Sequence, residues 1–207
     1  MRTGVKRLAL VLMILSAAGI GVALWLQRPF AAETGRPPLS GDMRQFSLLS
    51  APRPAPEVAF TDVAGRDISL AEFRGKLVLV NLWATWCGPC VVEMPSLDRL
   101  QAKLGGQNFT ILAISSDRAG SKVVEPFVDK LGLADLKVYL DPKGTANRAF
   151  GIRGLPTSIL IDREGRELGR YEGSAKWDSP EAVAFLKHFL GTPKPAADPL
   201  VKTSLTR

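Results

Sequence analysis

Apolar and polar positions along the middle of the chain follow two alternating patterns. Residues 76–83 and 109–115 are short, almost continuous apolar runs, which are typical of strands buried within a sheet. After each run, apolar residues recur at helical spacing, first over residues 90–104 and then over residues 122–131, and both helical patterns stop at a glycine. The pattern therefore predicts two strands that are each followed by a helix.

Shorter elements follow beyond residue 131. A short strand, a helical turn, two strands and a final helix are expected at residues 138–140, 145–150, 157–161, 167–171 and 178–190. The sequence Asp162-Arg163-Glu164-Gly165 is a hairpin turn between the last two strands. This order of elements implies an α/β fold, in which a mixed β-sheet carries helices on both faces.

The amino-terminal part of the chain has the pattern of a membrane segment. Arg2, Lys6 and Arg7 precede residues 8–26, an uncharged run of 19 residues. As a helix, this run nearly spans a hydrocarbon core of about 30 Å. Basic residues before the run favour an amino end in the cytoplasm. We therefore expect residues 1–27 to be a basic cytoplasmic end and one transmembrane signal-anchor, which crosses the lipid bilayer of the inner (cytoplasmic) membrane once.

Two other interpretations of this segment remain open. A cleaved signal peptide would use the small residues Gly21-Val22-Ala23, but cleavage there leaves Leu24-Trp25-Leu26 as an apolar stub. The apolar run is also longer than the 7–15 residues of a typical signal core. A buried helix of a soluble protein is the third interpretation. The first two both place the rest of the chain in the periplasm or at the cell exterior.

Both flanks of the α/β region are rich in proline or polar residues. The prolines of residues 28–56 predict an extended, poorly packed tether, with a helical turn or two near residues 43–49. Residues 192–207 predict a disordered tail. The sequence therefore assigns the folded domain to residues 57–191.

The positive charge of the chain lies outside this domain. The formal net charge is +7, but residues 56–191 hold 17 basic and 17 acidic side chains. The excess falls in residues 1–55 and 192–207. This distribution argues against a nucleic-acid-binding domain and indicates that partner choice rests on backbone pairing and shape near Cys87.

The candidate chemistry lies at Trp86-Cys87-Gly88-Pro89-Cys90, which contains the two cysteines of the chain. The pair stands between a predicted strand and a predicted helix. A sulfur at a helix start faces free backbone N–H groups and the positive end of the helix dipole, which stabilise a thiolate. Thiolate character is what thiol–disulfide exchange requires. We expect Cys87 to attack a substrate disulfide and the more buried Cys90 to resolve the mixed disulfide.

Other interpretations of the pair are weaker. A structural disulfide over two intervening residues closes almost no loop and stabilises little. A zinc site needs about four ligands, whereas the chain offers two cysteines and one distant histidine, His188. Peroxidase chemistry does not normally use a C-x-x-C partner. Cu(I) binding by Cys87 and Cys90 without redox turnover, as in a metallochaperone, remains the alternative function.

The motif carries a family resemblance. Residues 80–90, VNLWATWCGPC, resemble the active site of the thioredoxin superfamily. Residues 91–95, VVEMP, together with the amino-terminal anchor, look like the TlpA/ResA-like branch of membrane-tethered, periplasm-facing thiol–disulfide interchange proteins. The match covers roughly residues 56–191 and includes residues 151–157, GIRGLPT, which resemble the loop whose proline is cis in that superfamily. The resemblance implies a thioredoxin-like fold and a protein disulfide oxidoreductase.

The same resemblance implies roles for further residues. A cis-proline at Pro156 would place the Leu155 backbone beside Cys87, ready to pair with an extended substrate segment. The residues expected to contact substrate are Trp86, Gly88, Pro89, Leu155 and Pro156.

One position departs from thioredoxins proper. Asn81 stands where they carry a buried aspartate, and an amide cannot take a proton. In the TlpA/ResA-like branch a glutamate three residues after the second cysteine is a candidate acid/base, and Glu93 stands there. Burial would raise the pKa of this carboxyl toward useful values. The alternative is that Glu93 is solvated in the first turns of the helix.

These observations together predict the activity. The Gly-Pro dipeptide between the cysteines resembles reducing members of the superfamily, which indicates a reductase supplied with electrons by a membrane donor of the disulfide-reductase type. The resemblance suggests substrates such as apocytochrome c or the thiols of cytochrome oxidase and copper-site assembly proteins. We expect a monomer with the redox-active Cys87–Cys90 disulfide, no further cofactor, no metal and no nucleic-acid partner.

Overall fold

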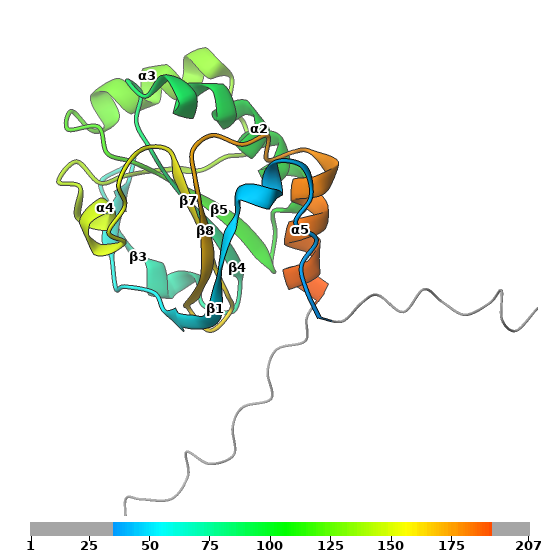
Figure 1. Ribbon diagram of the computed structural model, residues 1–207. Coiled ribbons are helices and arrows are strands. Elements are labelled where there is room, and N and C mark those ends of the chain that lie inside the picture. The colour runs from blue at the N-terminus through cyan, green and yellow to red at the C-terminus, as the bar shows by residue number, and fades with distance from the viewer. Residues whose placement is uncertain (1–34, 192–207) are drawn as a thin grey trace, which may run out of the picture. The chain divides into compact units, whose positions relative to one another are not determined.

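The computed structural model describes residues 35–191. Within them, one mixed sheet has the strand order β1-β8-β7-β4-β5-β6-β2-β3 (Figure 1). The strands are β1 (Ser47–Pro54), β2 (Ala59–Asp62), β3 (Asp67–Ser69), β4 (Leu77–Trp83), β5 (Phe109–Ser115), β6 (Val138–Leu140), β7 (Thr157–Ile161) and β8 (Arg166–Glu172). The helices are η1 (Gly41–Gln45), η2 (Leu70–Phe73), α2 (Gly88–Leu104), α3 (Ser121–Leu131), α4 (Thr145–Ala149) and α5 (Pro180–Gly191).

β4 lies in the interior of the sheet, and every one of its residues is buried. It pairs in parallel with β5 and antiparallel with β7, so neither of its edges is free. The pleat then divides its side chains between two cores: Leu79 and Trp83 face one, and Val78 and Val80 face the other. This arrangement explains why the strand reads as a continuous apolar run.

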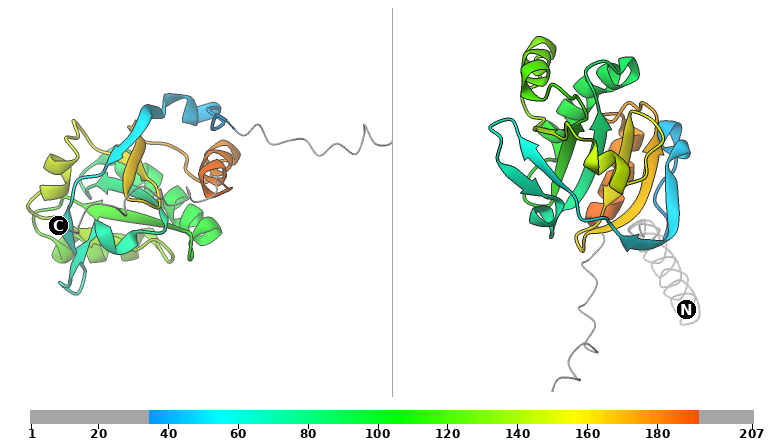
Figure 2. Two further views of the ribbon diagram at one scale, coloured as in Figure 1. Left: turned by 90° about the horizontal axis from the view of Figure 1, so that it is seen from below. Right: turned by 90° about the vertical axis from the view of Figure 1, so that its left-hand side faces the viewer.

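Helices cover both faces of the sheet, as predicted (Figures 1 and 2). α2, α3 and α5 contribute side chains to the core that contains Trp83, whereas α4 and η2 contribute to the core that contains Val80. The connections β4–α2–β5 and β5–α3–β6 both join parallel neighbours in the same direction across the sheet. Right-handed crossovers of this kind place their helices on one face.

The elements predicted between residues 76 and 190 are confirmed to within two residues at each end. β5, β6 and β7 have the predicted bounds, and α5 begins at Pro180.

The predicted tether is wrong for the described residues that precede residue 57. η1 and β1 belong to the fold, since Met43 and Phe46 are buried and β1 pairs with β8. The ring of Phe46 lies 4.6 Å from that of Phe185 on α5. β1 is an edge strand with an irregular register, and such strands tolerate proline.

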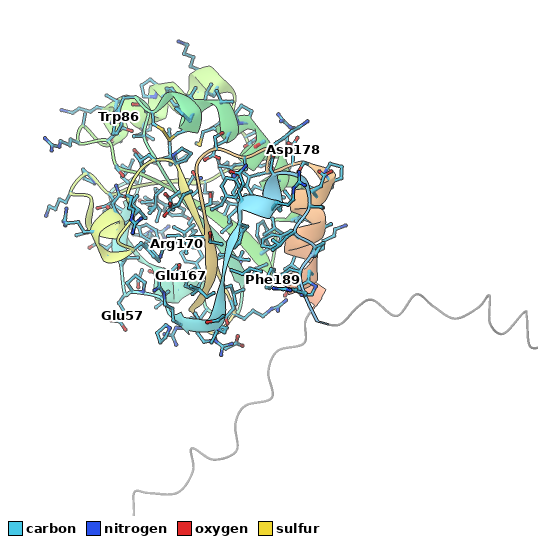
Figure 3. All side chains as sticks on the ribbon, viewed as in Figure 1. Glu57, Trp86, Glu167, Arg170, Asp178 and Phe189 are labelled. Atoms are coloured by element: carbon cyan, nitrogen blue, oxygen red, sulfur yellow. A yellow bond between two sulfur atoms is a disulfide. The ribbon has the colours of Figure 1, made fainter. Side chains whose placement is uncertain are left out.

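An ion-pair network also ties β1 to β8. The carboxylate of Glu167 is buried, and it accepts hydrogen bonds from Arg53 Nε at 3.1 Å and Nη2 at 2.9 Å and from Arg170 Nε at 2.9 Å. Figure 3 labels Glu167 and Arg170, which both come from β8. Arg53 comes from β1, so this contact fixes the edge strand to its neighbour.

Two further predictions fall outside the described residues. The expected transmembrane segment, residues 8–26, and the expected tail, residues 192–207, both lie there, as do residues 28–34 of the expected tether. Between residues 35 and 191, no helix has the length and apolar character needed to cross a membrane.

Candidate functional site

The two cysteines stand where β4 ends and α2 begins, as predicted. Cys87 is the N-cap of α2, and its Sγ accepts a hydrogen bond from the Cys90 backbone N–H at 3.3 Å. A disulfide joins the two residues, whose Cα atoms are 5.3 Å apart. Cys87 retains 6% of its surface exposed and Cys90 none. When the disulfide opens, the helix start and the Cys90 N–H therefore stabilise negative charge on the more accessible sulfur.

Asp117 fixes the segment that leads into the disulfide. This buried carboxylate follows β5, and it accepts hydrogen bonds from the Thr85 backbone N–H at 2.8 Å and from the Thr85 hydroxyl at 2.7 Å. The Ser115 hydroxyl donates to the same carboxylate at 2.8 Å. Thr85 is two residues before Cys87, so these contacts hold the approach to the first cysteine against β5.

The residues beside the first cysteine face solvent. Gly88 and Pro89 are exposed, and Trp86 has 72% of its surface exposed. Figure 3 shows Trp86 at the end of the molecule near α2 and α3. These three predicted contact residues are therefore accessible to a partner.

The loop before β7 contains the cis proline that the family resemblance implied. The Leu155–Pro156 peptide bond is cis. Pro156 is followed by Thr157, which lies opposite Leu82 in the β4–β7 pairing. Leu82 stands near the end of β4, so the cis bond lies at the same end of the sheet as Cys87.

Glu93 is buried behind the disulfide. It lies one turn of α2 beyond Cys90 and has 1% of its surface exposed. Its Oε1 accepts a hydrogen bond from Asn81 Nδ2 at 2.8 Å. Its Oε2 accepts from the Ala175 backbone N–H and from Trp177 Nε1, both at 3.1 Å. The carboxyl is therefore held in a polar site inside the core.

Burial sets the protonation of this carboxyl. Removal from water raises the pKa of Glu93 from 4.5 to about 7, because the charged form loses its hydration. Hydrogen bonds from Asn81, Ala175 and Trp177 lower the pKa, because each stabilises the carboxylate, but they offset only part of the rise. Glu93 can therefore exchange a proton near neutral pH. The interpretation of Glu93 as a solvated residue is wrong.

Asn81, at the position where thioredoxins proper carry an aspartate, binds the carboxyl of Glu93. Its Nδ2 donates to Glu93 and also to Ser158 Oγ at 2.9 Å, so it links β4, α2 and β7. Its Oδ1 is buried, and no hydrogen-bond partner for it lies within residues 35–191. Asn81 thus holds the buried carboxyl of Glu93 in a fixed orientation.

Trp177 is one of the site residues that the sequence did not reveal. It is fully buried, its indole N–H donates to Glu93, and its ring packs edge-on against Tyr171. No local signal identifies this role, because the contact with Glu93 joins residues 84 positions apart.

A pocket opens on the outer side of Glu93. It has a volume of about 340 Å³ and lies between α2 and the segment after β8. Its lining residues are Val92, Glu93, Ser96, Arg99, Ser174, Ala175 and Lys176. The buried acid therefore adjoins a hollow of the surface.

His188 lies away from this site. It belongs to α5, where its ring packs against Phe189. Across residues 35–191, no group of three or more His, Cys, Asp and Glu side chains could hold a metal ion.

Comparison with protein families matches residues 51–186 to the family described as Redoxin. A thiol-disulfide oxidoreductase ResA from Bacillus thuringiensis subsp. konkukian is 36% identical over 119 residues, which cover 58% of this chain and 68% of that protein. The ResA of Geobacillus thermodenitrificans is 36% identical over 112 residues, which cover 54% of this chain and 63% of that protein.

Solved structures resemble the fold as well. A structure described as a putative thiol:disulfide interchange protein DsbE from Chlorobium tepidum superposes with a TM-score of 0.62 and 31% identity, and the match covers 69% of this chain and 99% of that one. A putative thioredoxin from Neisseria meningitidis superposes with a TM-score of 0.52 and 32% identity, covering 59% of this chain and 81% of that one. The fold is thus shared with thiol–disulfide proteins.

Proposed function

The chain belongs to the Redoxin family and is a thiol–disulfide oxidoreductase, and from this premise we propose that it reduces disulfides of exported proteins. The observation that carries the proposal is the arrangement at the start of α2. An accessible sulfur, Cys87, is followed by a fully buried one, Cys90, and then by the buried acid Glu93.

The reaction proceeds by two exchanges. The Cys87 thiolate attacks one sulfur of the substrate disulfide, whose S–S bond breaks as the second substrate sulfur leaves as a thiolate. The Cys90 thiolate then attacks Cys87 Sγ, the mixed disulfide breaks, and the first substrate sulfur also leaves as a thiolate. Two electrons pass to the substrate, and the Cys87–Cys90 disulfide forms again. Water supplies the protons of the released thiols.

Glu93 serves the second exchange. Cys90 must lose its proton before it attacks, and no surface of Cys90 is exposed to water. Glu93 lies three positions further along α2, a spacing at which helical side chains are neighbours. A carboxyl with a pKa near ambient pH accepts such a proton efficiently. We assign this proton-transfer role to Glu93.

The substrate lies as an extended segment along the loop that ends in Pro156. The Leu155 backbone pairs with it, and Trp86, Gly88 and Pro89 contact it from the other side. The cis peptide bond and the exposure of these three residues support this arrangement.

The proposal includes a place in the cell. Residues 8–26 anchor the chain in the cytoplasmic membrane, and the domain faces the periplasm or the cell exterior as a monomer. A membrane protein with a dithiol reduces Cys87–Cys90 by the same exchange chemistry. As the family resemblance suggests, the substrates are apocytochrome c or the cysteine-containing proteins that assemble cytochrome oxidase or its copper sites.

The reduction potential tests the direction of electron flow. We expect the Cys87/Cys90 couple, equilibrated with glutathione, to lie near or below about −270 mV, as in thioredoxin. A potential near about −120 mV, which is that of a strong oxidant, would contradict a reductase. Insulin reduction tests the alternative: no reduction together with tight Cu(I) binding by both thiols would favour a metallochaperone.

A further inference from the structure

The two carboxyl oxygens of Glu93 have different partners within residues 35–191. Oε2 accepts from the Ala175 backbone N–H and from Trp177 Nε1, whereas Oε1 accepts from Asn81 Nδ2. A backbone N–H and an indole N–H can only donate. A proton on Oε2 would displace one of these two donors and leave it unpaired in the core, where an unpaired donor is costly. The contacts therefore favour Oε1 as the atom that takes up a proton.

Asn81 differs from the other two donors because its side chain also holds an acceptor. A side-chain amide has an NH₂ group that donates two hydrogen bonds and an oxygen that accepts two. The NH₂ group of Asn81 donates to Glu93 Oε1 at 2.8 Å and to Ser158 Oγ at 2.9 Å. The two ends of an amide have nearly the same size, so rotation about the Cβ–Cγ bond exchanges them without displacing their neighbours.

Ser158 fits both orientations of this amide. It stands directly opposite Asn81 in the pairing of β4 with β7, so the two side chains lie on the same face of the sheet. Its hydroxyl accepts from Asn81 in the structure, and a hydroxyl can equally donate. With the amide turned over, Asn81 Oδ1 would accept from the Ser158 O–H and from a protonated Glu93 Oε1.

The other end of the amide does not decide between the two orientations. Asn81 Oδ1 is buried and has no hydrogen-bond partner between residues 35 and 191. The amide therefore has one unpaired end in the orientation shown, and it would have one after rotation, at a similar cost in free energy. The bonds to Glu93 and Ser158 decide instead. An ionised Glu93 needs donors, whereas a protonated Glu93 needs an acceptor.

We propose that the Asn81 amide turns over each time Glu93 takes up or releases a proton on Oε1. This inference rests on the proposed function, in which the Cys90 S–H bond breaks as the Glu93 O–H bond forms. Without the rotation, the new O–H would lie unpaired in the core, which disfavours the transfer. With the rotation, the carboxylate and the acid both keep a hydrogen bond to Asn81. Asn81 is thus a positioning residue for the second exchange.

The described groups that surround Glu93 do not change charge near neutral pH. β4 and β7 hold no titratable side chain. On β8, burial and the charges of Asp42 and Glu93 raise the pKa of Tyr171, so its hydroxyl stays neutral. On the side of the pocket the charged groups are Arg99 and Lys176, which belong to types that titrate far above neutral pH. In the disulfide form neither cysteine titrates.

NMR of the full chain in an uncharged detergent tests the rotation directly. The disulfide form is labelled with nitrogen-15 at its three asparagines, Asn81, Asn108 and Asn147. Above the titration midpoint of Glu93, the Asn81 amide hydrogens should show a nuclear Overhauser effect to the Hβ atoms of Ser158. Below that midpoint the effect should be lost, because the amide hydrogens then point away from Ser158.

Asn147 is a matched control in the same protein. Its Nδ2 donates to Ser116 Oγ at 2.7 Å, and its Oδ1 is also buried without a partner among residues 35–191. Neither contact involves a titratable group, so the Overhauser effect between Asn147 and Ser116 should persist at every pH. In Glu93→Gln the Asn81 amide should likewise keep one orientation at every pH, since glutamine does not titrate.

Asn81→Leu provides an independent measurement. In the orientation shown, the bond from Asn81 lowers the pKa of Glu93, but a rotated amide also stabilises the protonated form. Removal of the amide therefore leaves the difference between the two forms nearly unchanged. In the disulfide form we expect the Glu93 carboxyl carbon to titrate at about 7 in Asn81→Leu, as in the natural chain. It should titrate at about 8 or 9 in Trp177→Phe, which removes a donor that cannot become an acceptor.

The outcomes separate the proposal from the function beneath it. An Overhauser effect between Asn81 and Ser158 that persists below the Glu93 midpoint overturns the rotation, and this test stands even if Asn81→Leu does not fold. A pKa of Glu93 that rises as far in Asn81→Leu as in Trp177→Phe overturns it too. Reduction of a small disulfide such as bis(2-hydroxyethyl) disulfide by the natural chain leaves the proposed function standing in either case, and its absence contradicts that function.

Discussion

Replacement of Trp177 by phenylalanine tests how the protein sets the pKa of Glu93. The change removes the indole N–H that donates to Glu93 Oε2 at 3.1 Å but keeps an aromatic ring in the core. A hydrogen bond to a charged group contributes about 1.5–3 kcal/mol, and one pKa unit corresponds to about 1.4 kcal/mol. Because the carboxylate loses this donor while the acid loses less, the pKa of Glu93 should rise from about 7 to about 8 or 9.

Carbon-13 NMR of the glutamate side chains measures this shift directly. In the reduced natural chain, one carboxyl carbon should titrate near neutral pH, and Glu93→Gln should remove that signal. In Trp177→Phe the same signal should titrate at higher pH, and the pH profile of disulfide reduction should move with it. The matched control is Trp83→Phe, since Trp83 is equally buried and its indole nitrogen has no partner among residues 35–191. An unchanged titration in Trp177→Phe, or an equal shift in Trp83→Phe, would refute the reasoning.

Three other substitutions address the acid, the approach to Cys87 and the edge strand. The raised pKa of Glu93 makes the natural fold lose stability as pH rises through about 7, whereas a glutamine does not titrate. The difference in unfolding free energy between Glu93→Gln and the natural chain should therefore shift by about 3 kcal/mol in favour of the variant from about pH 4 to pH 8. A difference in urea stability that stays the same at all pH values would contradict this. Asp117→Asn should cost about 1–3 kcal/mol and speed amide exchange at Thr85, since one amide cannot accept from every donor that the carboxylate serves; unchanged urea stability would contradict the assignment. Gly169→Ala should lower the free energy of unfolding by about 1–3 kcal/mol and speed hydrogen exchange in β1, because the new Cβ would clash with the Ser47 carbonyl oxygen. Protection of β1 equal to that of the natural chain would contradict this clash.

The central part of the fold was predictable because its signals are local. β4 and β5 are continuous apolar runs, and α2 follows with apolar residues at helical spacing. The position of the C-x-x-C pair between β4 and α2 then follows from the order of the elements, and with it the difference in burial between Cys87 and Cys90.

The edge strand β1 was not predictable because its prolines suggested a tether. Pro52 and Pro54 lack a backbone donor, which weakens a central strand but not an edge strand. What holds β1 comes from distant parts of the chain, namely the ring of Phe185 against Phe46 and the carboxylate of Glu167 against Arg53. A local pattern contains neither contact. The sequence also did not predict the hairpin strands β2 and β3, which are only four and three residues long.

The environment of Glu93 was only partly predictable. Family resemblance identified the residue as a candidate acid, but helical spacing leaves open which face of α2 it occupies. Its burial depends on Asn81, Ala175 and Trp177, which come from a strand and a loop far apart in the sequence. Such convergence appears only once the chain is folded.

Trapping of the mixed disulfide tests the central claim that Cys87 performs thiol–disulfide exchange. The full chain with Cys90→Ser is reduced, mixed with a disulfide-containing peptide and analysed by mass spectrometry after digestion. The account predicts a stable adduct of one peptide per chain on Cys87, whereas the natural chain completes the reaction and releases the peptide in its dithiol form. The partner variant Cys87→Ser should form little adduct, because Cys90 is buried. No adduct on Cys87 in the Cys90→Ser chain, or an equally rapid adduct on Cys90 in the Cys87→Ser chain, would contradict the account.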